Sequence, residues 1–387
     1  MNINNNSIVL LKLSIQEDGE EYIIGDPQTE NYIKVPSEAV EVIKMCNGTN
    51  TIEATQKMNP EVDVLDFIET LIELDLVFKV DDQQLLKDST QKSNSKIIDF
   101  VSHLFFNRIA YMVYGLLFLT SLLLIFMNPK ITPHTNDFFL LDYMGINFLI
   151  VFLTSWFLTF IHEFGHFLAA SKFNVPVKFQ LSLRMYWLVV EANMTNLWSI
   201  NKKQRYVAFF GGIMFDSVLL FSALVVQLSS SNSFLVSYAK LITLILAFKF
   251  CWHFFVFLRT DLYYVLTNRL NISNLHENAK IYITQRLKRN DSRLDEIPES
   301  EVKQTKRFAS LYIVGFIIAI LMFFGYSLPI LSLTIESSLK QLAYFNTSKL
   351  IFFDGLLTTL LLLVQGSIWL VGAMNKLKES KKAALYH

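Results

Sequence analysis

A cluster of two histidines and a glutamate at residues 162–166 is the strongest chemical signal in the sequence. His162 and His166 are four residues apart, and Glu163 follows the first histidine, which gives the pattern H-E-x-x-H. On a helix this spacing places both imidazoles on one face, where they can bind one zinc ion. Zinc lowers the pKa of a bound water to about 7, and Glu163 is close enough to act on that water. The pattern predicts metal-dependent hydrolysis of an amide bond, with Glu163 as the general base.

The surroundings of this cluster argue against a chance occurrence of the pattern. The cluster lies in an apolar stretch from Gly145 to Ala170, which is long enough to cross a bilayer. A charged side chain near the centre of a bilayer costs about 2.5–3.5 kcal/mol, so ionisable residues in such a stretch usually have a function. We therefore expect a metal site here rather than ordinary polar residues at a helix end.

A third metal ligand has to come from another part of the chain, because a catalytic zinc has three protein ligands and one open position. The candidates are Asp216, His253, Asp261 and Asp354. Asp261 is expected at the same membrane depth as the histidines and is the predicted ligand, whereas Asp354 is expected about a membrane thickness away. Asp216 is predicted to be a buried polar contact or a support for a ligand. His253 is predicted to form an interhelical hydrogen bond.

Six apolar stretches are long enough to span a bilayer, which takes about 20 residues. They are roughly Ile109–Met127, Gly145–Ala170, Tyr206–Leu228, Phe234–Leu258, Phe308–Ile335 and Leu350–Met374. Lysine and arginine gather in the loops after the second and fourth stretches and in a basic tail at residues 376–387, which the positive-inside rule assigns to the cytoplasm. The chain is therefore predicted to be an α-helical multi-pass protein of the cell membrane, with both termini cytoplasmic.

Residues 1–82 are predicted to form a small cytosolic α+β domain ahead of the membrane region. Strand-like segments between Ser7 and Val35 precede three helical patterns, of which the second is expected to begin with Asn50 and Glu53 as a capping pair. This order favours a winged-helix-like module. Residues 83–108 are then expected to form a linker and an interfacial amphipathic helix, and residues 109–375 to form the six-span membrane domain.

Composition excludes several other classes of protein. The formal net charge is zero and the basic residues lie in short clusters, so the sequence has no nucleic-acid-binding surface. Cys46 and Cys251 are the only cysteines, and both are expected to be reduced. The first residues lack a basic start followed by an apolar segment, so we expect no cleavable signal peptide.

A β-hairpin is predicted beside the motif, at residues 179–192. Phe179–Leu183 alternates between apolar and polar residues, and Tyr186–Ala192 is rich in residues that favour strands. Such a hairpin could hold a peptide in the extended form that hydrolysis requires, although its aromatic tip could instead anchor the chain at the membrane surface. Trp198 and Arg205 are expected to anchor the start of the third apolar stretch.

The N-terminal domain and the membrane region each resemble a known family. The order of elements in the domain, with a helix end near residues 43–49, resembles the PqqD-like domains, which bind a precursor peptide by adding its leader as a strand. The membrane region resembles the putative peptide zinc metalloproteases of the site-2 protease clan, in their YydH-like branch. That resemblance is carried by His162–Ala170, Glu191–Asp216 and Leu258–Leu266.

The second resemblance implies a set of functional residues. In that family two histidines and the aspartate of an R-x-D-G-Y-Y-x-L motif bind zinc and the glutamate is catalytic, which corresponds here to His162, His166, Asp261 and Glu163. Leu262 stands where the family has glycine. The resemblance implies an intramembrane protease that matures a ribosomally made, modified peptide, with a peptide-modifying enzyme and a transporter as partners. Two alternatives are regulated cleavage of a membrane-anchored regulator and a non-hydrolytic role in peptide export or immunity.

Overall fold

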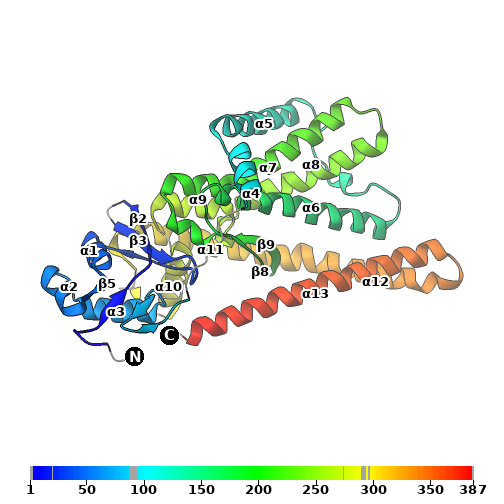
Figure 1. Cartoon of the computed structure of the whole chain (residues 1–387). Helices are drawn as coiled ribbons and strands as arrows, with labels where there is room; N and C mark the ends of the chain where they lie inside the picture. Colours follow the sequence, from blue (N-terminus) through cyan, green and yellow to red (C-terminus); the bar gives the residue numbers. More distant parts are fainter. Residues whose placement is uncertain are drawn as a thin grey trace. The chain divides into compact units, whose positions relative to one another are not determined.

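The structure is a computed structural model that describes residues 3–19, 21–87, 95–272, 274–288, 293–294 and 297–385. The chain divides into two compact units, which Figure 1 colours along the sequence. The first unit contains residues Met1–Phe106 together with two later segments, Phe167–Lys178 and Asn193–Ala208. The second unit contains Asn107–His166, Phe179–Ala192 and Phe209–His387.

The first unit contains the predicted small α+β domain. Its strands are β1 (Ile8–Leu10), β2 (Ser14–Asp18), β3 (Glu21–Asp26), β4 (Asn31–Val35), β5 (Asn47–Thr51), β6 (Lys79–Val80) and β7 (Gln83–Gln84). They form an antiparallel sheet in the order β2-β3-β4 and a second sheet in the order β5-β1-β6-β7. Along the chain, α1 (Ser37–Met45) follows β4, and α2 (Ile52–Met58) and α3 (Val64–Glu73) follow β5. The apolar faces of these helices meet in one buried core. The N-cap of α2 is Thr51 rather than the expected Asn50, since the Thr51 hydroxyl accepts a hydrogen bond from the Ala54 amide at 3.2 Å.

A buried arginine joins this domain to the later segments of the same unit. Arg205 is fully buried, and its guanidinium donates to the Asp18 carboxylate at 3.0 Å and to the carbonyls of Leu197 and Ile200. It also lies over the ring of Trp198, 4.7 Å from its centroid. Arg205 was expected to anchor the start of a membrane span, and what the structure shows is its pair with a carboxylate of the N-terminal domain.

The predicted interfacial helix is α4 (Lys96–Phe105), which begins with Ser95 as its N-cap. Ile97, Phe100 and Leu104 are more than half exposed and recur at helical spacing, as a helix lying on a membrane surface requires. The middle of the predicted linker, residues 88–94, lies outside the described residues.

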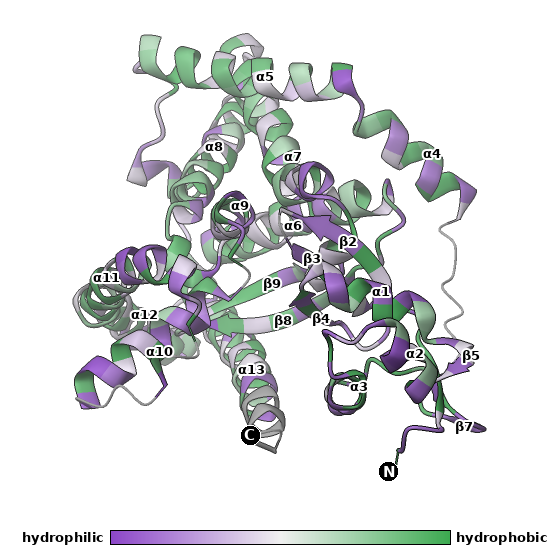
Figure 2. Cartoon of the chain, turned by 90° about the vertical axis from the view of Figure 1, so that its left-hand side faces the viewer, coloured by the Kyte–Doolittle hydropathy of each residue, from purple (hydrophilic) through white to green (hydrophobic). Residues whose placement is uncertain are grey.

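Among the described residues, six helical segments are long and apolar enough to cross a membrane. They are α5 (Arg108–Met127), α6 (Met144–Ser171), α7 (Lys202–Ser229), α8 (Ser233–His253), a segment at Glu299–Asn346 and α13 (Lys349–Leu385). Figure 2 shows hydrophobic residues running along α5, α7 and α8, and many exposed side chains of these helices are apolar. A multi-pass membrane protein is therefore the class that the helices support.

Two of these segments differ from their predicted bounds. Helix α8 ends at His253 rather than continuing to Leu258. The fifth segment is 48 residues long and combines α11 (Glu299–Met322), a π-helical turn at Phe323–Ser327, α12 (Leu328–Leu342) and a 3₁₀ turn at Ala343–Asn346. At 1.5 Å per residue it is about 70 Å long, about twice the thickness of the hydrocarbon core. Helix α12 packs beside α13, and the predicted tail begins inside α13, while residues 386–387 lie outside the described part of the chain.

The remaining elements connect these helices. They are the 3₁₀ turns at Thr135–Phe138, Thr195–Ser199 and Val256–Leu258, the strands β8 (Lys178–Arg184) and β9 (Trp187–Asn193), and the helices α9 (Asp261–Leu270) and α10 (Leu275–Lys288). Strands β8 and β9 pair with each other, so the hairpin predicted at residues 179–192 is present.

Candidate metal centre

The two histidines of the H-E-x-x-H pattern lie on one face of α6. This helix is continuous from Met144 to Ser171, so residues 162 and 166 are one turn apart. Their Nε2 atoms are 3.1 Å from each other, and both side chains are buried. The spacing in the sequence therefore produces the paired imidazoles that it predicts.

Asp261 completes a triangle of donor atoms with these histidines. Its Oδ2 atom lies 3.1 Å from Nε2 of His162 and 3.1 Å from Nε2 of His166. Three ligands of a tetrahedral zinc ion, each at about 2.0–2.1 Å from the metal, are about 3.3–3.4 Å apart. The triangle is only slightly tighter than this, so its three donor atoms fit one metal ion.

A turn between α8 and α9 brings Asp261 to the histidines. After His253 the chain forms a short 3₁₀ turn and Arg259 adopts a left-handed conformation, with φ of 57°. The Thr260 hydroxyl donates to the His253 carbonyl at 2.7 Å, which closes the turn. Asp261 is then the first residue of α9, and Leu262 follows it within the helix. A helical backbone accommodates leucine without strain, so this position does not require the glycine of the resembling family.

Asp354 lies at the opposite end of α6 from the histidines. Its carboxylate accepts hydrogen bonds from the backbone amides of Met144 at 3.1 Å and Gly145 at 2.7 Å, and so caps the first turn of α6. His162 is eighteen residues further along this helix, at a distance of about 27 Å. The separation predicted for Asp354 is confirmed.

Asp216 supports His162 from α7. Its Oδ2 atom is 2.7 Å from Nδ1 of His162, and its Oδ1 atom accepts a hydrogen bond from the Lys249 ammonium at 3.2 Å. A carboxylate on Nδ1 fixes the ring orientation and directs Nε2 toward a metal. Asp216 is thus the buried contact that was predicted. Lys249 was not singled out in the sequence, although a lysine inside the apolar stretch at Phe234–Leu258 was a signal for it.

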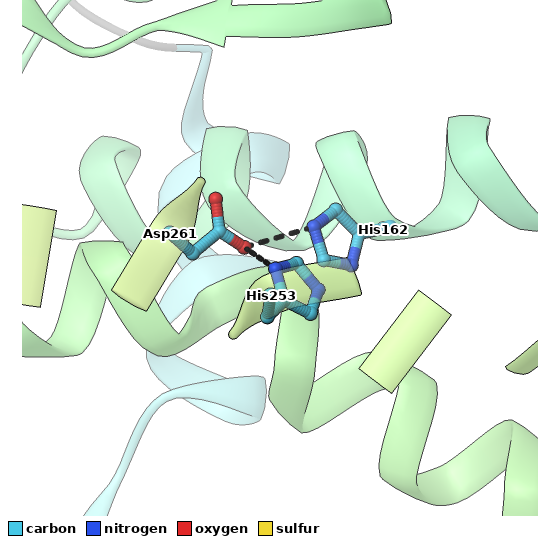
Figure 3. A group of neighbouring side chains, drawn as sticks. All are labelled: His162, His253 and Asp261. Atoms are coloured by element: carbon cyan, nitrogen blue, oxygen red, sulfur yellow. Dashed lines mark hydrogen bonds and ion pairs between the residues drawn. The ribbon is translucent and has the colours of Figure 1, made fainter. Parts of the chain in front are cut away.

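His253 differs from its prediction. It was expected to form an interhelical hydrogen bond, yet neither of its ring nitrogens has a hydrogen-bond partner among the described residues. Its ring is buried and stacks on that of His162, with centroids 5.3 Å apart, and its Nδ1 atom is 3.6 Å from Oδ2 of Asp261. Figure 3 shows that both imidazoles face the Asp261 carboxylate. The turn after α8 brings His253 beside a residue that a continuous helix would have placed two turns away.

Glu163 lies beside the triangle and is held by the hairpin. Its side chain is buried, and its Oε2 atom accepts a hydrogen bond from the Ala192 amide of β9 at 2.7 Å. The hairpin itself is fixed by Glu191, which accepts hydrogen bonds from Gln180 at 2.9 Å and Ser182 at 2.8 Å and pairs with Arg184. Burial raises the pKa of Glu191, but Arg184 and the hydrogen bonds outweigh it and hold the pKa below its ordinary value. The hairpin therefore keeps the Glu191 carboxylate charged and orients the Glu163 carboxylate at the site.

A cavity of about 290 Å³ opens beside these groups. It is lined by residues of α6, α8, the hairpin and the turn before α9, among them His162, Glu163, Trp187, His253 and Asp261. Its volume is at the lower limit of ligand pockets. A short extended segment of a peptide is therefore a suitable occupant, whereas a folded domain is too large.

Gly212 leaves the space that the ring of His162 occupies. A Cβ atom at Gly212 would lie 2.5 Å from Nε2 and from Cε1 of His162, too close for either to stay in place. Gly212→Ala is therefore expected to displace His162 and to lower zinc affinity by at least about tenfold, the lower limit for loss of a ligand's support. Competition with a chromophoric chelator measures this affinity.

The matched control is Gly115→Ala in α5, where a Cβ would meet nothing within 4 Å. This variant is expected to bind zinc as the wild type does. Equal affinities of the Gly212→Ala variant and the wild type would contradict the placement of His162.

Comparisons of the chain with family models, with curated proteins and with solved structures found no match. A function for this protein is therefore inferred from the geometry of the site.

Proposed function

We propose that this protein is a zinc-dependent endopeptidase of the membrane, in which His162, His166 and Asp261 bind the metal and Glu163 is the general base. One observation carries the proposal. Three donor atoms lie 3.1 Å from one another, and the buried carboxylate of Glu163 lies beside them in the lining of a cavity. Two imidazoles and one carboxylate leave a fourth position open, as hydrolytic zinc sites require.

The metal, when bound, polarises the scissile carbonyl and lowers the pKa of the attacking water. Glu163 accepts the proton of that water and passes it to the nitrogen of the leaving amine. The Ala192 amide orients Glu163, and Asp216 holds His162 in the tautomer that leaves Nε2 free. These roles use Glu163, Asp216 and the Ala192 amide, and they leave His253 without one.

An extended peptide is the substrate that this surrounding favours. The hairpin β8–β9 donates a hydrogen bond to Glu163 and forms part of the cavity wall. Strands bind extended peptides through main-chain hydrogen bonds. The six apolar helices support a substrate that is delivered from, or anchored in, the membrane. The hairpin, the apolar helices and the two family resemblances together support maturation of a ribosomally made peptide. Cleavage is proposed to occur at the cytoplasmic face of the membrane, where both termini are proposed to lie.

The test uses the full chain purified in detergent and a mixture of synthetic peptides, each with an apolar segment of about 20 residues, which matches a membrane span. Mass spectrometry of the products is expected to show new peptide termini. Cleavage should stop when a chelator removes the metal and return when zinc is added back. Unchanged cleavage in the metal-free protein would contradict a metalloprotease, and metal analysis identifies the ion that the protein carries.

A further inference from the structure

His253 is the buried polar group that the proposed mechanism leaves without a role. Both of its ring nitrogens are buried without a hydrogen-bond partner in the described part of the chain. Its Nδ1 atom lies 3.6 Å from Oδ2 of Asp261, which is too far for a hydrogen bond. An imidazole that is buried in this way is unfavourable unless something binds it.

The position of this imidazole relative to the metal-binding groups suggests what binds it. One donor atom from each of His162, His253 and Asp261 can be chosen so that all three lie within 4.8 Å of one another. The 3.6 Å between Nδ1 of His253 and Oδ2 of Asp261 is close to the separation of about 3.3–3.4 Å between two ligands of one tetrahedral zinc ion. His162 and Asp261 belong both to the triangle with His166 and to this second group with His253. An ion held by the triangle is therefore also near His253.

We propose that His253 is a fourth ligand of the metal, through Nδ1, and that it occupies the position that a hydrolytic zinc keeps open. This inference rests on the proposed function. It deepens that function because a metal with four protein ligands has no position for water, which is the arrangement of structural rather than catalytic zinc. The resting protease is then latent, and an entering peptide has to displace His253.

The local structure permits such a displacement. His253 is the last residue of α8, and the chain after it runs through an irregular turn from Phe254 to Thr260. A side chain at a helix end followed by a turn can move without unfolding the helix. The two histidines of the triangle lack this freedom, since both lie within the continuous helix α6.

The test counts the imidazoles bound to zinc by X-ray absorption spectroscopy of the full-length, zinc-loaded protein. The wild type is expected to show three imidazoles and no water. His253→Phe keeps a ring to stack on His162 but removes the donor atom, so it should show two imidazoles and one water. His253→Gln should show the same loss, and both should bind zinc at least about tenfold more weakly. His276→Gln, at a buried histidine of α10, is the control and should keep three imidazoles.

The count in the wild type decides the proposal even where a variant fails to fold. Two imidazoles in a wild-type protein that cleaves peptides would overturn the role of His253 and leave the proposed function standing. If the wild type shows three imidazoles but cleaves no peptide, and the His253 variants cleave none either, His253 is supported as a ligand and the proposed protease activity is overturned. A His253→Phe variant that still shows three imidazoles would exclude His253 as a ligand.

Discussion

Glu163→Gln is expected to lower kcat/KM for peptide cleavage by about 10²–10⁴-fold, the usual contribution of a general base. Glutamine has nearly the shape of glutamate, and its amide oxygen can still accept the hydrogen bond from Ala192. The hairpin and the triangle of ligands are therefore expected to stay in place. Zinc content should remain one ion per chain, and only proton transfer should be lost.

The measurement combines steady-state kinetics on a cleaved peptide with metal analysis of the same samples. Glu53→Gln is a suitable control, because Glu53 is an exposed residue of α2 in the other unit. It should cleave at the wild-type rate. If Glu163→Gln cleaves as fast as the wild type with zinc bound, another group is the base and the assignment of Glu163 is wrong.

Asp18→Leu is expected to destabilise the first unit by about 3–5 kcal/mol, because it removes the carboxylate of a buried ion pair. The side chains of Asp18 and Arg205 are each 1% exposed and form an ion pair at 3.0 Å. Without Asp18, the guanidinium loses this carboxylate but keeps its contacts with the carbonyls of Leu197 and Ile200 and with the face of Trp198. Amide hydrogen exchange in β2 and β3, measured by mass spectrometry on the full chain, should become faster.

A second substitution distinguishes a lost ion pair from lost packing. Asp18→Leu combined with Arg205→Met replaces the pair by apolar side chains and is expected to recover much of the stability, as in other buried pairs. Glu53→Ala removes an exposed pair with Lys57 and should leave the exchange rates unchanged. If the double variant exchanges no more slowly than Asp18→Leu alone, the charge of Arg205 is not the cause.

The sequence predicted those parts of the site that depend on position along a helix. Two histidines four residues apart have to share a face, and depth counted along the membrane stretches correctly separated Asp354 from them and brought Asp261 level with them. The prediction for His253 was wrong because it assumed that α8 continues to Leu258. The turn at Phe254–Thr260 is held by backbone hydrogen bonds and by the Thr260 hydroxyl, and no periodicity in the sequence indicates it.

Contacts between residues far apart in the chain were also missed. The pair of Asp18 and Arg205 is separated by 187 residues, and the amide of Ala192 reaches Glu163 from a different element. Hydrophobic patterns predict which face of an element is buried, but they do not predict which polar groups meet there. The hairpin itself was predicted, because alternation of apolar and polar residues is a local property.

The polar groups around the triangle also determine which ions the site can hold. Asp216, Asp261 and Glu163 with their ordinary charges carry three negative charges, and Lys249 beside Asp216 carries one positive charge. While both imidazoles are neutral, one divalent cation neutralises this excess of two negative charges, whereas one monovalent cation leaves one negative charge over. Charge balance thus favours divalent over monovalent ions at this site, and ligand geometry then determines which divalent ion binds best. A single sodium or potassium ion beside neutral imidazoles would leave one negative charge uncompensated in this cluster.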